Sequence, residues 1–277
     1  MDAKATAAAT ATAATDAFGH FDDERREYVI TRPDTPYPWI NYLGSEVFFS
    51  LISNTAGGYA FYRDAKFRRL TRYRYNNVPV DDGGRYFYVR DGDTTWSPGW
   101  KPCRTPLDHY ECRHGMGYTQ ITGEKDGIRV SVLFFVPPGD HVEVQRVTVE
   151  NRSGRARSLQ LYSFVEWCLW NAEDDMSNFQ RNYSVGEVEV HGGTLFHKTE
   201  YRERRDHFAF YTVNAEVDGF DTDRDTFLGP YNGFDRPDQV SAGTSGDSVA
   251  HGWSPVASHR LDLELDAGES RELVDLL

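Results

Sequence analysis

The sequence predicts an all-β protein, a large β-sandwich made of two broad antiparallel sheets packed face to face. Apolar residues recur at every second position in many short segments, which is the period of a strand with one buried face. Turn-forming Gly, Pro, Asn and Asp separate these segments, and no long segment shows helical periodicity. Aromatic residues make up 14% of the chain and favour strands. Many short strands with such turns are typical of a sandwich.

The expected strands are short and are bounded by turn residues. Outside the centre and the end of the chain they lie at 28–31, 47–52, 59–62, 86–89, 118–121, 194–198 and 208–213.

The clearest alternation lies in the middle of the chain. Apolar residues occupy every second position over 128–134, and the pattern resumes over 142–149 and 159–165. Its phase slips once near Gln145 and Arg146, which suggests a β-bulge. Three consecutive strands with short links predict an antiparallel meander.

The end of the chain repeats the pattern over 259–265 and 273–274, with a turn between them. No Ser/Pro-rich linker divides the chain, so we expect one β-sandwich domain over 18–277. Residues 1–17 are rich in Ala and Thr and contain no Leu, Ile or Val, unlike a secretion signal or a membrane span. We expect a disordered tail or a start-site artefact there.

Charge and cysteine content exclude several classes of protein. The net charge is −13, which argues against sequence-independent binding to nucleic acid or to an anionic membrane. Cys103, Cys112 and Cys168 are odd in number and lack CxxC spacing, so neither a disulfide framework nor a zinc site is indicated. Reduced thiols are typical of a cytoplasmic protein. No metal or organic cofactor is predicted.

An unusual polar stretch follows a strand-like run. Residues 170–182 combine amides, acids and an arginine with two aromatic rings. A sugar presents hydroxyl groups at its edges and C–H groups on its faces. A sugar site therefore needs side chains that donate and accept hydrogen bonds beside flat aromatic rings. A polar loop after a buried strand is the alternative.

Two other features suggest chemistry, each with a structural alternative. Glu166 has apolar neighbours, which would raise the pKa of a proton donor in glycoside cleavage; it could instead form a salt bridge. The segment 221–225 imitates the start of a calcium loop, but Thr226 and Asn232 replace the expected Gly and Glu. The alternative is a charged turn in which Arg224 pairs with nearby carboxylates.

Several long strings resemble the cellobiose phosphorylase family, glycoside hydrolase family 94 (formerly glycosyltransferase family 36). They lie at 19–23, 26–31, 35–44, 62–66, 69–77, 167–172, 201–207 and 219–227. Together they carry the resemblance over 18–277.

The resemblance implies a galactose-mutarotase-like supersandwich that precedes a helical (α/α)6 catalytic barrel. Members of the family are cytosolic inverting phosphorylases, which split cellobiose with inorganic phosphate into α-glucose 1-phosphate and glucose. Their general acid and phosphate pocket belong to the barrel, which has no counterpart in this sequence. We therefore assign no catalytic residue here, and we do not expect this chain to catalyse phosphorolysis alone.

By the same resemblance, the sandwich contributes dimer contacts and a loop to the acceptor subsite of a neighbouring subunit, where cellobiose or glucose binds. Asn171, Asn178, Gln180 and Arg181 would line this subsite, with Arg181 as a fork that holds two hydroxyl groups. The charged string 202–206 is expected to form ion pairs between strands, or to touch substrate or barrel.

Two hypotheses remain for the whole chain. In the first, it is the N-terminal sandwich of a homodimeric cellobiose phosphorylase, either as a fragment or as one subunit of a split enzyme. In the second, it is a stand-alone carbohydrate-binding or scaffolding module. Under the first hypothesis, both cellobiose and longer cellodextrins are compatible with the sequence as substrates.

Overall fold

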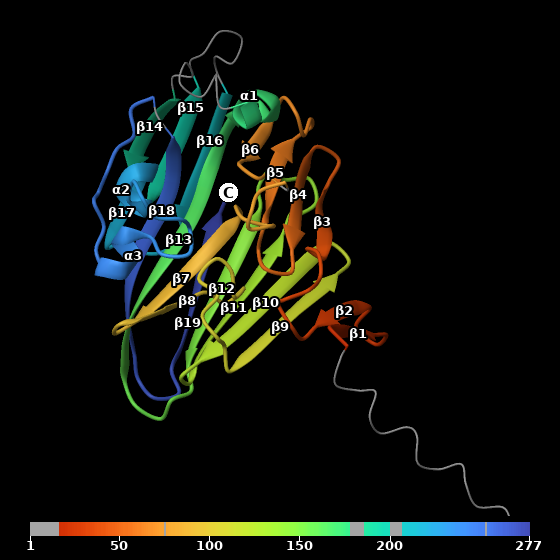
Figure 1. The fold of residues 1–277 in the computed structure, drawn as a ribbon, viewed down its shortest axis with the longest axis vertical. Coiled ribbons are helices and arrows are strands. Elements are labelled where there is room, and N and C mark those ends of the chain that lie inside the picture. Colours follow the sequence, from red (N-terminus) through yellow and green to blue (C-terminus); the bar gives the residue numbers. More distant parts are fainter. Residues whose placement is uncertain (1–16, 75, 178–185, 200–206, 253) are drawn as a thin grey trace, which may run out of the picture.

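In the computed structural model, two antiparallel sheets stack face to face, which confirms the predicted fold class (Figure 1). The structure describes residues 17–74, 76–177, 186–199, 207–252 and 254–277. No described helix is long and apolar enough to cross a membrane. The boundary expected between a tail and the sandwich at residue 17 stays a prediction.

Within the described residues, the first sheet has ten strands. In spatial order they are β1 (Gly19–Asp22), β2 (Glu27–Ile30), β9 (His109–Gly115), β10 (Tyr118–Lys125), β11 (Ile128–Phe135), β12 (Val144–Asn151), β19 (Ser270–Leu276), β16 (His207–Val213), β15 (Thr194–Thr199) and β14 (Gly186–His191).

The second sheet has nine strands in the same described part of the chain. Seven follow one another as β17 (Gly219–Asp223), β18 (Pro255–Leu265), β13 (Arg157–Trp170), β6 (Arg69–Thr71), β5 (Gly58–Tyr62), β4 (Phe48–Ser53) and β3 (Ile40–Ser45). Beside them, β7 (Arg85–Asp91) pairs with β13 and with β8 (Thr94–Trp96).

Three short helices accompany the sheets in the part of the chain that the structure describes. They are α1 (Ala172–Ser177), α2 (Arg224–Leu228) and α3 (Asp238–Ala242). Figure 1 shows α1 at one end of the sandwich, directly after the long strand β13, and shows α2 and α3 beside β17 and β18.

The predicted meander is wrong at its third strand. β12 pairs with β11 and β19, whereas β13 pairs with β18 and β7 in the other sheet. The link at 152–156 therefore carries the chain from one sheet to the other. Strands of both sheets bury one apolar face in the same interior, so the alternation of residues does not reveal the sheet to which a strand belongs.

The predicted bulge near Gln145 is also wrong. The register of β12 against β11 is continuous from Val144 to Asn151, and Gln145 points into the core with no exposed surface. Its side-chain amide donates a hydrogen bond to Glu143 Oε1 at 3.0 Å. The alternation thus continues without a slip, with polar residues, Gln145 and Asn151, at two inward positions of β12.

A buried ion pair joins the two sheets. The Arg85 guanidinium, at the start of β7, lies with its Nε 2.7 Å from Glu143 Oε1, and both side chains have no exposed surface. Arg85 also donates to Ser50 Oγ at 2.6 Å and to the carbonyl of Leu51 at 3.0 Å, both on β4. Two charges removed from water at this site depend on each other and on these hydrogen bonds.

We expect Glu143→Gln to lower the free energy of unfolding by about 3–5 kcal/mol, because the buried Arg85 charge loses its partner. Urea unfolding followed by tryptophan fluorescence measures this. The matched control is Glu272→Gln, since the Glu272 carboxylate lies 3.9 Å from Arg146 at the surface. That change should cost less than about 0.5 kcal/mol. Equal effects in the two variants would contradict a special role for the buried pair.

A second buried group of polar side chains lies between the sheets. Asp275 Oδ1 on β19 is 4.0 Å from His259 Nδ1 on β18, and the Tyr211 ring stacks on the His259 ring with centroids 5.3 Å apart. Burial raises the pKa of Asp275 to about 8, although the hydroxyl groups of Tyr211 and Ser163 act to lower it. Burial also lowers the pKa of His259 to about 4. Both groups are therefore neutral at pH 7.

This arrangement predicts a pH dependence with a defined sign. The ordinary pKa of an Asp carboxyl is 3.8, so between pH 3.8 and 8 the folded state binds the Asp275 proton and the unfolded state releases it. The free energy of unfolding contributed by this group falls as the pH rises through that interval. His259 acts in the opposite direction, but only below its ordinary pKa of 6.5.

The interval from pH 6.5 to 8 therefore isolates the effect of Asp275. We expect the wild-type free energy of unfolding to fall across it, by at most about 1.4 kcal/mol per pH unit for one proton. Asp275→Asn should flatten this slope, while the exposed Asp266→Asn should retain it. Urea unfolding at several pH values provides the measurement, and a wild-type slope retained in Asp275→Asn would refute the assignment.

Candidate functional site

Asn171, the first of the predicted acceptor-site residues, marks the start of α1. Its side-chain Oδ1 accepts a hydrogen bond from the backbone N–H of Glu173 at 3.0 Å, and its carbonyl accepts one from Asp175 at 3.0 Å. This is the geometry of a helix N-cap. The structure therefore gives the side-chain oxygen of Asn171 a structural role at the end of β13.

The other three predicted acceptor-site residues lie outside the described residues. They are Asn178, Gln180 and Arg181, and their contact with a sugar stays a prediction, as does the role of the string 202–206. What the structure does describe is the base from which 178–181 continue, namely α1 and its contacts.

Two arginines hold α1 against the second sheet. Arg72 lies with its Nε 2.9 Å from Asp175 Oδ2 on α1 and donates through a terminal nitrogen to Glu166 Oε1 on β13 at 2.9 Å. Arg74 donates to the backbone carbonyl of Asp175 at 2.5 Å. Burial alone would lower the pKa of Arg72, but the carboxylates of Glu166 and Asp175 outweigh it and raise that pKa.

A third contact ties α1 to the turn after β5. The N–H of Ala172 donates to the carbonyl of Lys66 at 2.8 Å, and the Lys66 ammonium lies 2.5 Å from a Glu173 carboxylate oxygen at the surface. The short helix is thus fixed through its backbone and its side chains, which gives the segment that follows it a defined starting point.

Glu166 is a buried ion-pair partner. One carboxylate oxygen lies 2.9 Å from Arg72 and 3.1 Å from Arg224 Nε, and the side chain is 6% exposed. The salt-bridge alternative for Glu166 is therefore confirmed. Two guanidinium groups stabilise its charged form, whereas a proton donor must be stable in its protonated form.

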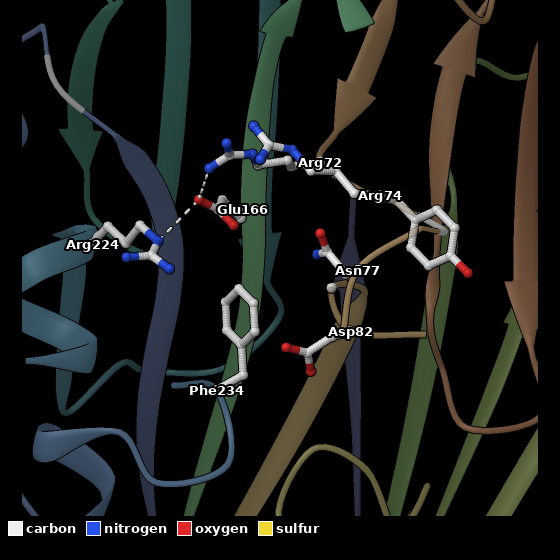
Figure 2. Close-up of a pocket in the computed structure, with 9 residues that line it drawn as sticks. Arg72, Arg74, Asn77, Asp82, Glu166, Arg224 and Phe234 are labelled. Atoms are coloured by element: carbon white, nitrogen blue, oxygen red, sulfur yellow. Dashed lines mark hydrogen bonds and ion pairs between the residues drawn. The ribbon is translucent and has the colours of Figure 1, made fainter. Parts of the chain in front are cut away.

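A pocket of about 230 Å³ opens beside this ion pair (Figure 2). Its wall is formed mainly by Arg72, Arg74, Asn77, Asp82, Glu166, Arg224 and Phe234. The Arg224 guanidinium lies over the Phe234 ring, 5.6 Å from its centroid. Burial raises the pKa of Asp82. Figure 2 shows Asp82 and Phe234 facing one another below Glu166 and Arg224.

Sequence reasoning missed this pocket because its residues come from three distant parts of the chain. The string 69–77 was notable for its resemblance to a family, and 219–227 for that resemblance and for its calcium-like segment, but neither indicated a pocket. No sequence pattern indicated a binding role for Asn77, Asp82 or Phe234, since each is an ordinary residue of a polar or turn-rich segment.

The carboxylates of the calcium-like segment have structural roles. Asp221 accepts hydrogen bonds from the backbone N–H of Gly246 and from the hydroxyl of Ser248, at 3.0 and 2.7 Å. Asp223 caps α2 by accepting from the N–H of Thr226 at 2.8 Å. With Arg224 paired to Glu166, this supports the alternative of a charged turn. Among the residues that the structure describes, no group of three or more His, Cys, Asp or Glu is placed to hold a metal ion.

Comparison with known proteins gives consistent matches. The family model "Glycosyl hydrolase 94, supersandwich domain" matches residues 26–277. The chain is 37% identical over 259 residues to an N,N'-diacetylchitobiose phosphorylase of Vibrio furnissii, covering 91% of this chain and 32% of the relative. It is 32% identical to a solabiose phosphorylase of Paenibacillus borealis, covering 84% of this chain and 31% of the relative.

A solved structure described as a kojibiose phosphorylase from the human microbiome has a similar fold. The TM-score is 0.52 at 10% identity, and the match covers 94% of this chain and 32% of that one. The chain thus spans about a third of the length of these proteins.

We expect Arg72→Lys to loosen α1 without unfolding the sandwich. Lysine keeps the charge, but it lacks the planar fork that reaches Glu166 and Asp175 together. Hydrogen–deuterium exchange of the amides in 172–177 should become at least about tenfold faster, which corresponds to about 1.4 kcal/mol. The amides of β10 and β11 should be unaffected.

The matched control for this experiment is Lys66→Met, which removes the exposed ammonium that contacts Glu173 and lies over the Phe67 ring. An exposed ion pair contributes little, so exchange in α1 should change by less than about fivefold. If Arg72→Lys leaves the exchange in α1 at the wild-type rate, the fork of Arg72 does not hold the helix.

Proposed function

Because this chain belongs to the Glycosyl hydrolase 94 family, whose supersandwich domain it forms, we propose that it is the N-terminal domain of an inverting disaccharide phosphorylase. Such an enzyme splits a disaccharide with inorganic phosphate and needs no organic cofactor or metal. The family match over 26–277 carries this proposal, and the phosphorylases among its relatives support it.

The substrate we propose is a disaccharide of the cellobiose type. The resemblance of the sequence strings implies cellobiose itself. Relatives 36–37% identical are named for N,N'-diacetylchitobiose, an N-acetylated disaccharide, which makes that sugar the competing candidate. The two candidates differ in whether the acceptor subsite must accommodate an N-acetyl group.

The domain would contribute to the acceptor side of the active site. In this proposal α1 is the fixed base, and the segment after it presents Asn178, Gln180 and Arg181 to the acceptor sugar of a neighbouring subunit. A guanidinium fork and two amides match the hydroxyl groups of a sugar. Asn171 would act indirectly, since its side-chain oxygen caps the helix.

Catalysis itself would take place in a helical barrel that belongs to the same polypeptide or to a separate one. The proton donor and the phosphate site lie there in this proposal, and the sandwich adds contacts between subunits of a cytoplasmic homodimer. Exposed apolar side chains, such as Tyr42 on β3 at 69% exposure and Met116 in the turn between β9 and β10 at 82%, are available for such contacts.

The test is an assay of the full-length product of the gene that encodes this chain. We expect phosphate-dependent release of a sugar 1-phosphate from cellobiose or from N,N'-diacetylchitobiose. Arg181→Ala should lower kcat/KM for the acceptor in the synthetic direction by about 10- to 100-fold, because hydrogen bonds to a charged group are lost. Absence of phosphorolysis with both sugars would overturn the proposal.

A control variant for this assay is Arg155→Ala, which changes an exposed arginine in the turn between β12 and β13. It should leave the kinetic constants unchanged. An equal loss of activity in the two variants would mean that the effect of Arg181→Ala is not specific to the acceptor subsite.

A further inference from the structure

We propose that the pocket shown in Figure 2 is a binding site for one neutral sugar ring, formed by this domain alone. The side chains of Asn77, Asp82 and Arg224 would bind the sugar, and Phe234 would form the apolar wall. This site uses none of the residues that we assign to the acceptor subsite, so it goes beyond the proposed function.

The first support is a set of polar groups that the fold does not use. Within the described part of the chain, the side chains of Asn77 and Asp82 make no hydrogen bond or ion pair. Arg224 contacts Glu166 through Nε at 3.1 Å, and its nearest terminal nitrogen is 3.9 Å from Asp225, too far for a hydrogen bond. An amide, a carboxylate and the end of a guanidinium are therefore left to face the pocket.

The second support is the chemistry of these three groups. A carboxylate accepts hydrogen bonds, a guanidinium donates them, and an amide does both. A ligand that satisfies all three must carry groups that donate and accept, as the hydroxyl groups of a sugar do. Figure 2 shows Asn77 and Asp82 on one side of the space and Arg224 on the opposite side, so that hydroxyl groups at opposite edges of one ring would face them.

Charge balance favours a neutral ligand over an anion. Three arginines line the pocket or its rim, but Arg72 and Arg74 are engaged with α1, and Arg72 and Arg224 share Glu166. Asp82 then brings a further carboxylate into the pocket itself. A phosphate group would have to approach that carboxylate, which opposes its binding.

Phe234 supplies apolar ring surface to the pocket, beside the Arg224 guanidinium, which lies 5.6 Å from the ring centroid. Its ring is half-buried and is held by Phe164 and Tyr86, with centroids 5.6 and 6.1 Å away. It is thus fixed on the aromatic core and presents its remaining surface to the pocket. The volume of about 230 Å³ is below that of pockets for drug-sized ligands and suits a single ring.

The experiment is a titration of this chain with glucose, N-acetylglucosamine, cellobiose and inorganic phosphate, followed by NMR chemical shifts. We expect one of the sugars to bind with a dissociation constant on the order of 1 mM, and phosphate to bind more weakly. Asn77→Ala and Asp82→Ala should each weaken sugar binding at least about fivefold, the effect of one lost hydrogen bond. Neither residue supports the fold, so thermal unfolding should stay near the wild-type temperature.

The chain offers close controls for both variants. Asn76→Ala changes the adjacent, exposed asparagine, and Asp93→Ala changes an exposed aspartate outside the pocket; both should bind sugar as the wild type does. The proposal is overturned if no sugar binds, if phosphate binds more tightly than every sugar, or if binding persists in Asn77→Ala and Asp82→Ala.

One further variant separates this site from the proposed function. Arg181→Ala changes the predicted acceptor segment and none of the residues that line the pocket. Loss of sugar binding in Arg181→Ala, with retention in Asp82→Ala, would show that the sugar binds at the predicted acceptor segment, and it would refute the pocket as the sugar site. Conversely, binding lost in Asp82→Ala would support the pocket whatever the outcome of the phosphorolysis assay.

Discussion

The buried pair of Arg85 and Glu143 is the constraint on which the rest of the sandwich depends. It places two oppositely charged side chains in the interior with no exposed surface, where each is stable only beside the other. The relative position of the sheets is therefore set by the short distances of one ion pair as well as by apolar packing. Arg85 follows the pocket residue Asp82 by three positions, so the same pair also fixes the segment that carries Asp82 into its place.

Alternation of residues was sufficient to predict the fold class and most strands, because burial of one face imposes a period of two regardless of topology. The strand expected at 128–134 is observed as Ile128–Phe135, and that at 259–265 lies within Pro255–Leu265. Alternation failed where the interior is polar. Gln145 interrupts the apolar pattern in the sequence, because a buried amide looks like a surface residue until its partner, Glu143, is known.

The sequence also predicted only part of the candidate site. The polar stretch at 170–182 was recognisable because its residues are adjacent in the sequence, and the family resemblance gave it a role. The pocket beside Glu166 was not recognisable in the sequence. Asn77 and Arg224 line it together because β13 lies between β6, which precedes Asn77, and β18, whose other partner β17 precedes Arg224. Glu166 was noticed for its apolar neighbours in sequence, but its arginine partners come from segments about 60 and 90 residues away.

The placement of the last two strands has a consequence for biosynthesis. β19 lies between β12 and β16, and β18 lies between β17 and β13, so each sheet is completed from within by a segment that leaves the ribosome late. Until then β12 and β13 present open edges and apolar faces, which are templates for association with other chains. Nascent chains of this domain should thus depend on chaperones until translation has passed residue 276, and ribosome stalling before that point should favour aggregation.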